Sequence, residues 1–157
     1  MNIRHKKIKA GVIGSPINHS LSPCIHNFWL KKYGINCFYE AIEVKENELE
    51  KFFKNLSKEG FAGVNVTVPY KQKVSEYLDK LSERAIKIGA VNTVIVKKDG
   101  SLFGDNTDSY GFIENLKDQQ SIPKKINEND IAIVIGAGGA ARAIIVGLLD
   151  AGFLSIK

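Results

Sequence analysis

The fold class is decided by the stretch Ile131-Ala-Ile-Val-Ile-Gly136-Ala-Gly138-Gly139-Ala-Ala141-Arg142, near the carboxyl end of the chain. Five consecutive apolar residues predict a parallel strand that is covered on both faces. The glycines that follow have the spacing G-x-G-x-x-A. In this pattern Gly136 permits a tight turn, Gly138 lets the backbone approach a pyrophosphate, and Ala141 allows the next helix to pack closely. The stretch therefore predicts the start of a dinucleotide-binding unit.

A helix is expected over residues 139–151, because Gly152 is a helix-stop signal. Its unpaired amino-terminal amides and the positive end of its dipole would favour a phosphate. A glycine-rich turn between a strand and a helix also occurs where packing alone requires it, so that reading stays open. On the functional reading, the predicted cofactor-binding residues of this turn are Gly136, Ala137, Gly138, Gly139 and Ala140.

Composition limits the classes of function. The 157 residues are 44% hydrophobic, which supports a globular core, and the net charge of +5 comes from lysines scattered among acids. We therefore expect no nucleic-acid partner and no membrane span. The apolar segment near the start of the chain is too short for a signal peptide. Two cysteines, Cys24 and Cys37, cannot build a disulfide framework in a chain of this size, so we expect a reduced, cytoplasmic protein. His5, His19 and His26 lack ligand spacing, so we expect no metal.

Hydrophobic periodicity predicts alternating strands and helices along the rest of the chain. Expected strands cover residues 9–13, 37–44, 64–68, 90–96 and 102–103. The first expected helix has Ser22 as its N-cap and one apolar face formed by Ile25, Phe28 and Trp29. Later helices are expected around Phe52, over residues 83–88 with Ser82 as the cap, and over residues 109–116.

This order predicts an α/β protein with two parts. Residues 1–117 would form a mixed α/β substrate-binding domain, and residues 118–130 a linker. Residues 131–157 would supply the first strand and helix of a Rossmann-type unit. Because a complete unit takes about 100 residues, we expect this one to be truncated, and a missing carboxyl-terminal half or self-association to be needed to complete it.

Polar side chains gather where the expected strands end, which is where open α/β sheets bind ligands. The clusters are Ser20 and Ser22; Asn65, Thr67 and Lys71; Asn92 and Thr93; and Asp105-Asn-Thr-Asp108. Together they predict a site for a small polyhydroxylated acid, in which a lysine near an aspartate could move a proton. Each residue also has a plain structural reading: Ser22 and Asp108 as helix caps, and Lys71 as a surface lysine.

Five motifs in this order closely resemble those of shikimate dehydrogenases. The motifs are Ser20-Leu-Ser22-Pro23, Asn65-Val-Thr67-Val-Pro69-Tyr-Lys71, Gly89-Ala-Val-Asn92-Thr93, Gly104-Asp-Asn-Thr-Asp108 and Gly136-Ala-Gly-Gly-Ala140. The resemblance spans the whole chain. It implies a substrate domain, a Rossmann domain, and reversible NADPH-dependent reduction of 3-dehydroshikimate to shikimate, on the route to chorismate and aromatic amino acids.

The resemblance also implies residue roles. Ser20 and Ser22 would hold the substrate carboxylate, while Lys71 and Asp108 would form the catalytic pair, with Lys71 as the base. The ring hydroxyls would be contacted by Asn65, Thr67, Asn92 and Asp108.

Glu83 matches a position that is sometimes given a contact on the cofactor side, although a carboxylate that favours the helix dipole is the plainer reading. Ser109 departs from the family pattern, which commonly has glycine there. The residue that would distinguish NADP from NAD is expected about 20 positions after Gly136, so the choice of NADP follows from the resemblance alone.

Three alternatives stay open. A quinate or shared quinate/shikimate dehydrogenase would have a similar site, although the serine pair favours shikimate. A non-catalytic module would bind shikimate without turning over a nicotinamide cofactor. Methylenetetrahydrofolate dehydrogenase has a similar two-domain architecture, but its expected tyrosine-to-lysine spacing is not evident in this sequence.

Overall fold

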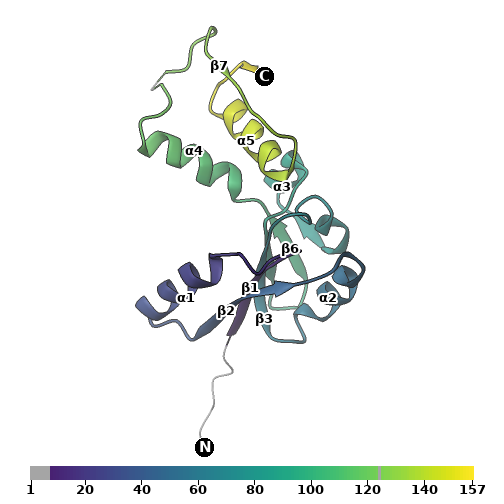
Figure 1. Ribbon diagram of the computed structural model, residues 1–157. Coiled ribbons are helices and arrows are strands. Elements are labelled where there is room, and N and C mark those ends of the chain that lie inside the picture. The colour runs from purple at the N-terminus through teal and green to yellow at the C-terminus, as the bar shows by residue number, and fades with distance from the viewer. Residues whose placement is uncertain (1–7, 124) are drawn as a thin grey trace, which may run out of the picture.

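A six-stranded mixed sheet with strand order β2-β1-β3-β5-β6-β4 forms the centre of the described chain, which covers residues 8–123 and 125–157 of a computed structural model (Figure 1). Its strands are β1 Ile8–Gly14, β2 Cys37–Glu43, β3 Phe61–Val66, β4 Lys80–Leu81, β5 Thr93–Val96 and β6 Leu102–Asp105. The helices are α1 Ser22–Lys32, η1 Glu46–Glu48, α2 Leu49–Leu56, η2 Val74–Tyr77, α3 Glu83–Ile88, α4 Asp108–Asp118 and α5 Gly139–Asp150. Strands β7 Ile131–Ala132 and β8 Ser155–Ile156 form a second, parallel pair.

The direction of β5 decides where the polar clusters meet. Strand β1 pairs in parallel with β2 and with β3, as a sequence of alternating strands and helices predicts. Strand β5 instead runs antiparallel to β3, with Thr93 opposite Asn65. The amino end of β5 therefore lies beside the carboxyl end of β3. The expected strand over residues 90–96 is shorter in the structure, which leaves Asn92 just outside the sheet at this edge.

Helices α1 and α2 lie on opposite sides of the sheet (Figure 1). The α2 side holds the main core, in which Leu49, Phe53 and Leu56 are buried against the strands, as the periodicity predicts. In the strand expected over residues 64–68, Val64 and Val66 are buried, at 3% and 2% exposure. Val68 is instead 71% exposed, because β3 ends at Val66 and the chain has already turned.

The apolar face predicted for α1 does not pack on the sheet. Ile25, Phe28 and Trp29 are 47%, 62% and 49% exposed, and α1 has no buried residue. The helix attaches to the sheet through its polar Asn27, whose side chain forms hydrogen bonds with the backbone of Tyr39 in β2. The side of α1 that faces the sheet instead carries His26, Asn27 and Leu30, of which His26 stacks on Tyr39 and Leu30 packs on the core beneath the helix.

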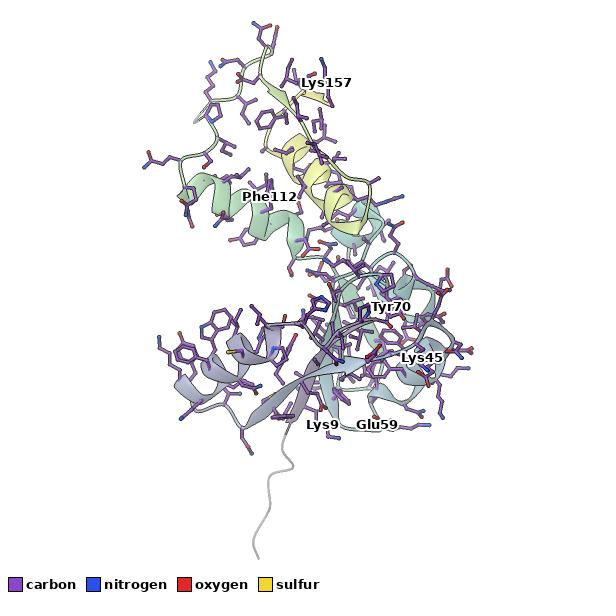
Figure 2. All side chains as sticks on the ribbon, viewed as in Figure 1. Lys9, Lys45, Glu59, Tyr70, Phe112 and Lys157 are labelled. Atoms are coloured by element: carbon purple, nitrogen blue, oxygen red, sulfur yellow. The ribbon has the colours of Figure 1, made fainter. Side chains whose placement is uncertain are left out.

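The strand predicted over residues 131–135 is also wrong as a fully buried strand. Strand β7 covers two residues, and the pairing with β8 is extended by the Val134 amide, which donates to the Lys157 carbonyl, and by the Lys157 amide, which donates to the Ala132 carbonyl. The side chains of Ile131, Ile133 and Ile135 are 52%, 74% and 98% exposed. Ala132 and Val134 point the other way and pack against a cluster that includes Phe112 of α4, labelled in Figure 2. One face of this pair is thus covered and the other is open.

Helix capping follows the sequence in part. Ser82 caps α3 by accepting a hydrogen bond from the Ala85 amide at 3.0 Å, and Gly89 ends the helix with a φ of +69°, as predicted. Helix α5 ends at Asp150, close to the expected stop, and Gly152 has a φ of +105°.

In the part of the chain that the structure describes, no helix has both the length and the apolarity that a membrane crossing requires. His5 lies outside the described residues.

Helices α4 and α5 cross closely at Gly147. A Cβ atom built on Gly147 would lie 2.9 Å from the Ser109 Oγ and 2.9 Å from a carbon of the Ile113 side chain. Ser109, which departs from the family pattern, is buried at 6% exposure in this contact. Glycine at position 147 therefore fixes how near α5 can approach α4.

We predict that Gly147→Ala lowers the free energy of unfolding by about 1 kcal/mol, because crowding costs more than the gain in helix propensity. The matched control is Gly111→Ala in α4, where a Cβ atom would meet nothing within 4 Å. That variant should raise the free energy of unfolding by about 0.5–1 kcal/mol. Urea denaturation measures both. Equal stabilisation by the two variants would contradict the close contact at Gly147.

Candidate active site

The carboxylate of Asp108 joins two of the predicted clusters. Its Oδ2 lies 2.6 Å from the Nζ of Lys71, and its Oδ1 accepts a hydrogen bond of 2.7 Å from the Asn92 amide. The Lys71 and Asp108 side chains are 17% and 27% exposed, so the ion pair is partly screened from water yet open to a ligand. The structure thus brings together Lys71 and Asp108, which lie 37 positions apart in the sequence.

The position of Lys71 is set by its neighbours in the turn after β3. Tyr70, labelled in Figure 2, is 3% exposed, and its hydroxyl donates a hydrogen bond of 2.7 Å to the Val44 carbonyl. The Val91 amide donates to the Lys71 carbonyl at 2.6 Å. The turn is therefore anchored on the core side, which leaves the Lys71 side chain to point toward Asp108.

Asp108 is held by the residues that precede it. The Asn106 side chain is fully buried, donates to the Ala90 carbonyl at 3.0 Å and accepts from the Asp108 amide at 3.0 Å. Thr107 adds a second tie, because its hydroxyl accepts from the Asn92 amide at 2.9 Å. The segment between β6 and α4 consequently has a fixed shape, and it places the carboxylate at the first turn of α4, where the helix dipole favours negative charge.

Asn65 extends this polar network to β3. Its amide nitrogen lies 3.2 Å from the Thr93 hydroxyl and 3.3 Å from the Asn92 carbonyl, and its amide oxygen accepts from the Tyr39 hydroxyl at 2.7 Å. Thr67 follows at the end of the strand, where its amide donates to the Ile13 carbonyl at 3.0 Å. The predicted ring-contacting residues of β3 and β5 therefore lie at one edge of the sheet.

The two predicted serines lie in the loop that leads from β1 into α1. The Ser20 hydroxyl accepts a hydrogen bond of 3.3 Å from the Ser22 amide, and both side chains are partly exposed. The prediction that Ser22 caps α1 is wrong. The backbone is already helical at Leu21, so Leu21 occupies the cap position and Ser22 is the first helical residue. This leaves the Ser22 hydroxyl without a capping role.

The glycine-rich turn lies against Lys71. A Cβ atom built on Gly139 would be 3.0 Å from the Lys71 Cβ and 3.5 Å from the Ala90 Cβ, so glycine permits this close approach without a shift of the lysine stem. A cavity of about 300 Å³ lies between the two segments and is lined by Val68, Pro69, Lys71, Gln72, Gly138, Gly139 and Ala140. The predicted catalytic lysine and the predicted cofactor turn thus share one cavity.

The glycine turn also has the properties that a pyrophosphate requires. Gly138 is the N-cap of α5 and makes no side-chain capping bond, and a Cβ atom at Gly138 would meet nothing within 4 Å. The first amides of this twelve-residue helix receive no side-chain cap from Gly138, and unpaired amides of this kind can bind a phosphate. Gly136 has a φ of +135°, a conformation that other residues rarely adopt. Glu83 is exposed at the start of α3 and does not line this cavity.

A larger cavity, of about 570 Å³, lies between α2, η2 and the β5–β6 hairpin, where it includes Phe53, Tyr77 and Leu102. None of the described residues that line it belongs to the polar network, so it is not the candidate active site. Among the described residues, no group of three or more His, Cys, Asp or Glu side chains is placed to hold a metal ion.

Sequence reasoning missed Tyr39 at this site, and it included Asn106 in a polar cluster without giving it a role of its own. Asn106 belongs to the quoted motif Gly104-Asp-Asn-Thr-Asp108, so its place between two candidate residues was a usable signal. Tyr39 had none, because it lies in an ordinary strand pattern, and only the pairing of β1 with both β2 and β3 brings it within reach of Asn65.

Comparisons with known proteins identify similar sequences and structures. A family model described as shikimate dehydrogenase substrate binding domain matches residues 12–94. The shikimate dehydrogenase (NADP(+)) of Roseobacter denitrificans is 50% identical over 143 residues, which are 91% of this chain and 51% of that protein. The corresponding protein of Paramagnetospirillum magneticum is 49% identical over 94% of this chain and 53% of its own length. The chain therefore spans about half the length of the curated relatives it matches.

Solved structures show the same similarity. Shikimate 5-dehydrogenase from Thermus thermophilus in complex with shikimate has a TM-score of 0.84 and 41% sequence identity, over 95% of this chain and 55% of that chain. The same enzyme in complex with NADP(H) and shikimate has a TM-score of 0.82, 40% identity and the same coverage. The mixed α/β fold predicted from the sequence is thereby confirmed.

We predict that Asn106→Ala lowers the free energy of unfolding by about 1–3 kcal/mol, because it leaves a buried carbonyl and a buried amide without partners. The matched control is Asn115→Ala, since Asn115 is exposed on α4, and its effect should stay within about 0.5 kcal/mol. Thermal or urea unfolding of both variants tests this. A loss at Asn106 no larger than that at Asn115 would show that the buried side chain does not hold the segment.

Proposed function

The chain belongs to the shikimate dehydrogenase family, and from this premise we propose that it carries the substrate site of an enzyme that reversibly reduces 3-dehydroshikimate to shikimate with NADPH. The observation that carries the proposal is the contact between Lys71 and Gly139. It places an ion-paired lysine of the substrate domain directly against a turn suited to a dinucleotide. Proton transfer and hydride transfer need this proximity, because both act on the same alcohol group.

The substrate would be held along the polar edge of the sheet. Ser20 and Ser22 would bind its carboxylate through their hydroxyls, at the end of the edge nearest α1. Its ring hydroxyls would meet the amides and hydroxyls of the network that runs toward α4, namely Asn65, Thr67, Asn92 and Asp108. Two anchoring points at different ends of the ring would fix which hydroxyl reaches Lys71.

Lys71 would transfer the proton, and Asp108 would hold Lys71 in place. In the reductive direction, Lys71 enters protonated in its ion pair with Asp108 and donates a proton to the substrate carbonyl oxygen. In the oxidative direction, the same nitrogen accepts the proton of the substrate hydroxyl. Asp108 keeps the lysine in place and is itself oriented by Asn92, so the carboxylate binds and orients rather than reacts.

The glycine turn would hold the cofactor phosphates through the first amides of α5, at Gly138, Gly139 and Ala140. NADP, when bound, would supply the hydride-transfer chemistry at the carbon that bears the reacting oxygen. Val68 and Pro69 line the cavity with apolar surface next to Lys71, which would limit the access of water to the reacting atoms. The carboxylate of Glu83 would make a weak contact on the cofactor side.

Binding of shikimate without turnover is the second candidate function. The observation that favours it is the exposure of Ile133 and Ile135, which leaves one face of the cofactor unit open in the described chain. A missing carboxyl-terminal half or self-association would be needed for turnover in that case. Kinetics with shikimate and quinate tests whether quinate is an additional substrate.

We predict that Lys71→Ala lowers kcat by about 10²–10⁴-fold, because the proton acceptor is lost, while shikimate still binds. The assay follows absorbance at 340 nm as the chain is offered shikimate and NADP, with calorimetry for binding. The control is Lys51→Ala, since Lys51 lies exposed on α2, away from the site. Unchanged turnover by Lys71→Ala would remove the lysine from the mechanism. Shikimate binding with no reduction of NADP by the wild-type chain would support the second candidate.

We further predict that Ser22→Ala weakens shikimate binding by about 10–100-fold, since a hydrogen bond to a charged group contributes about 1.5–3 kcal/mol. Because Ser22 does not cap α1, the free energy of unfolding should stay within about 0.5 kcal/mol of wild type. Ser57→Ala, on the α2 side of the sheet, is the control. A variant that keeps wild-type affinity would exclude Ser22 from carboxylate binding.

A further inference from the structure

The Tyr39 side chain extends over strand β1 to reach Asn65 in the candidate site. It lies in the edge strand β2, opposite Ala10 of β1, and Asn65 lies opposite Val12 on the other side of β1. The Tyr39 ring is 5% exposed and packs with Val12 and Ile17, so its position is fixed by the small core on the α1 side. From there its hydroxyl reaches the Asn65 Oδ1 at 2.7 Å.

The direction of this hydrogen bond follows from the partners of Asn65. The carbonyl of Asn92 can only accept a hydrogen bond, so the atom of Asn65 that faces it must be the amide nitrogen. The amide oxygen then faces Tyr39, whose hydroxyl must donate. Burial raises the pKa of Tyr39 to about 12, which keeps the hydroxyl protonated, and therefore a donor, at neutral pH.

Tyr39 is itself held by α1. The Asn27 side chain donates to the Tyr39 carbonyl at 2.7 Å and accepts from the Tyr39 amide at 3.1 Å. The His26 ring stacks on the Tyr39 ring with a centroid distance of 4.1 Å and an interplanar angle of 13°. Helix α1 begins at Ser22, so one tyrosine connects the helix that carries a proposed carboxylate ligand to the amide of Asn65.

We propose that Tyr39 is a positioning residue that holds the Asn65 amide in the orientation set by the Asn92 carbonyl, and thereby strengthens the binding of a substrate ring hydroxyl at Asn65. With Oδ1 held by one donor, its second lone pair is left for a substrate hydroxyl, and the amide cannot rotate to present its nitrogen there. This inference rests on the proposed function and deepens it.

The test uses Tyr39→Phe, which keeps the ring and its stacking on His26 and removes only the hydroxyl. Calorimetry with shikimate should give a dissociation constant about 3–10-fold above wild type, as expected for the loss of one ordinary hydrogen bond. The matched control is Tyr33→Phe, because Tyr33 is 68% exposed at the end of α1. Tyr33→Phe should bind shikimate with wild-type affinity.

Two further measurements separate positioning from general destabilisation. In an Asn65→Ala background, Tyr39→Phe should weaken binding by no more than about 1.5-fold, because coupled residues are not additive. In the free protein, the side-chain amide signals of Asn65 in a ¹H–¹⁵N spectrum should shift in Tyr39→Phe and stay in place in Tyr33→Phe. The spectrum needs no ligand, so it reports on the contact itself.

The outcomes are distinct. Wild-type affinity in Tyr39→Phe, or an equal loss of affinity with and without Asn65, overturns the positioning role and leaves the proposed function standing. A wild-type chain that binds no shikimate overturns the proposed function, and the inference fails with it. Weaker binding that depends on Asn65, together with shifted amide signals, establishes Tyr39 as the residue that orients this amide.

Discussion

The carboxylate of Asp108 lies between Lys71 and Asn92, and the arrangement of the whole site depends on this contact. Lys71 comes from the turn after β3, Asn92 from the approach to β5, and Asp108 from the start of α4. A carboxylate with two oxygens can accept from both partners at once, which leaves neither charge unpaired in a partly buried position. The three segments are therefore held together by one group.

Several features from separate parts of the chain support the contact of Asp108 with Lys71 and Asn92. The fully buried Asn106 fixes the backbone of Asp108, and the buried Tyr70 anchors the turn that presents Lys71. The close approach of Gly139 then brings the glycine turn onto the stem of the lysine. Helix α5 keeps this place because Gly147 lets it lie against α4, with Ser109 in the interface. Packing at some distance from the site thus sets the distance between the Lys71 turn and the glycine turn.

The polar network also reaches the other end of the site through Tyr39. Asn65 links β3 to β5, and Tyr39 links β3 to the edge strand and to α1. A substrate that contacted both the serine loop and Lys71 would therefore bind to groups that hydrogen bonds already hold in place. Such preorganisation lowers the entropic cost of holding a substrate in a reactive position.

The sequence by itself determined the order of the elements, the cap and stop of α3, and the list of polar residues that meet at one edge. These depend on local rules: Ser82 accepts from a nearby amide, Gly89 adopts a positive φ, and each polar motif follows a strand. Only the tertiary structure decided the rotation of α1, the antiparallel direction of β5, the exposure of Ile133 and Ile135, and the roles of Tyr39 and Asn106. Those features depend on partners far away in the sequence, which no local pattern of apolar and polar residues encodes.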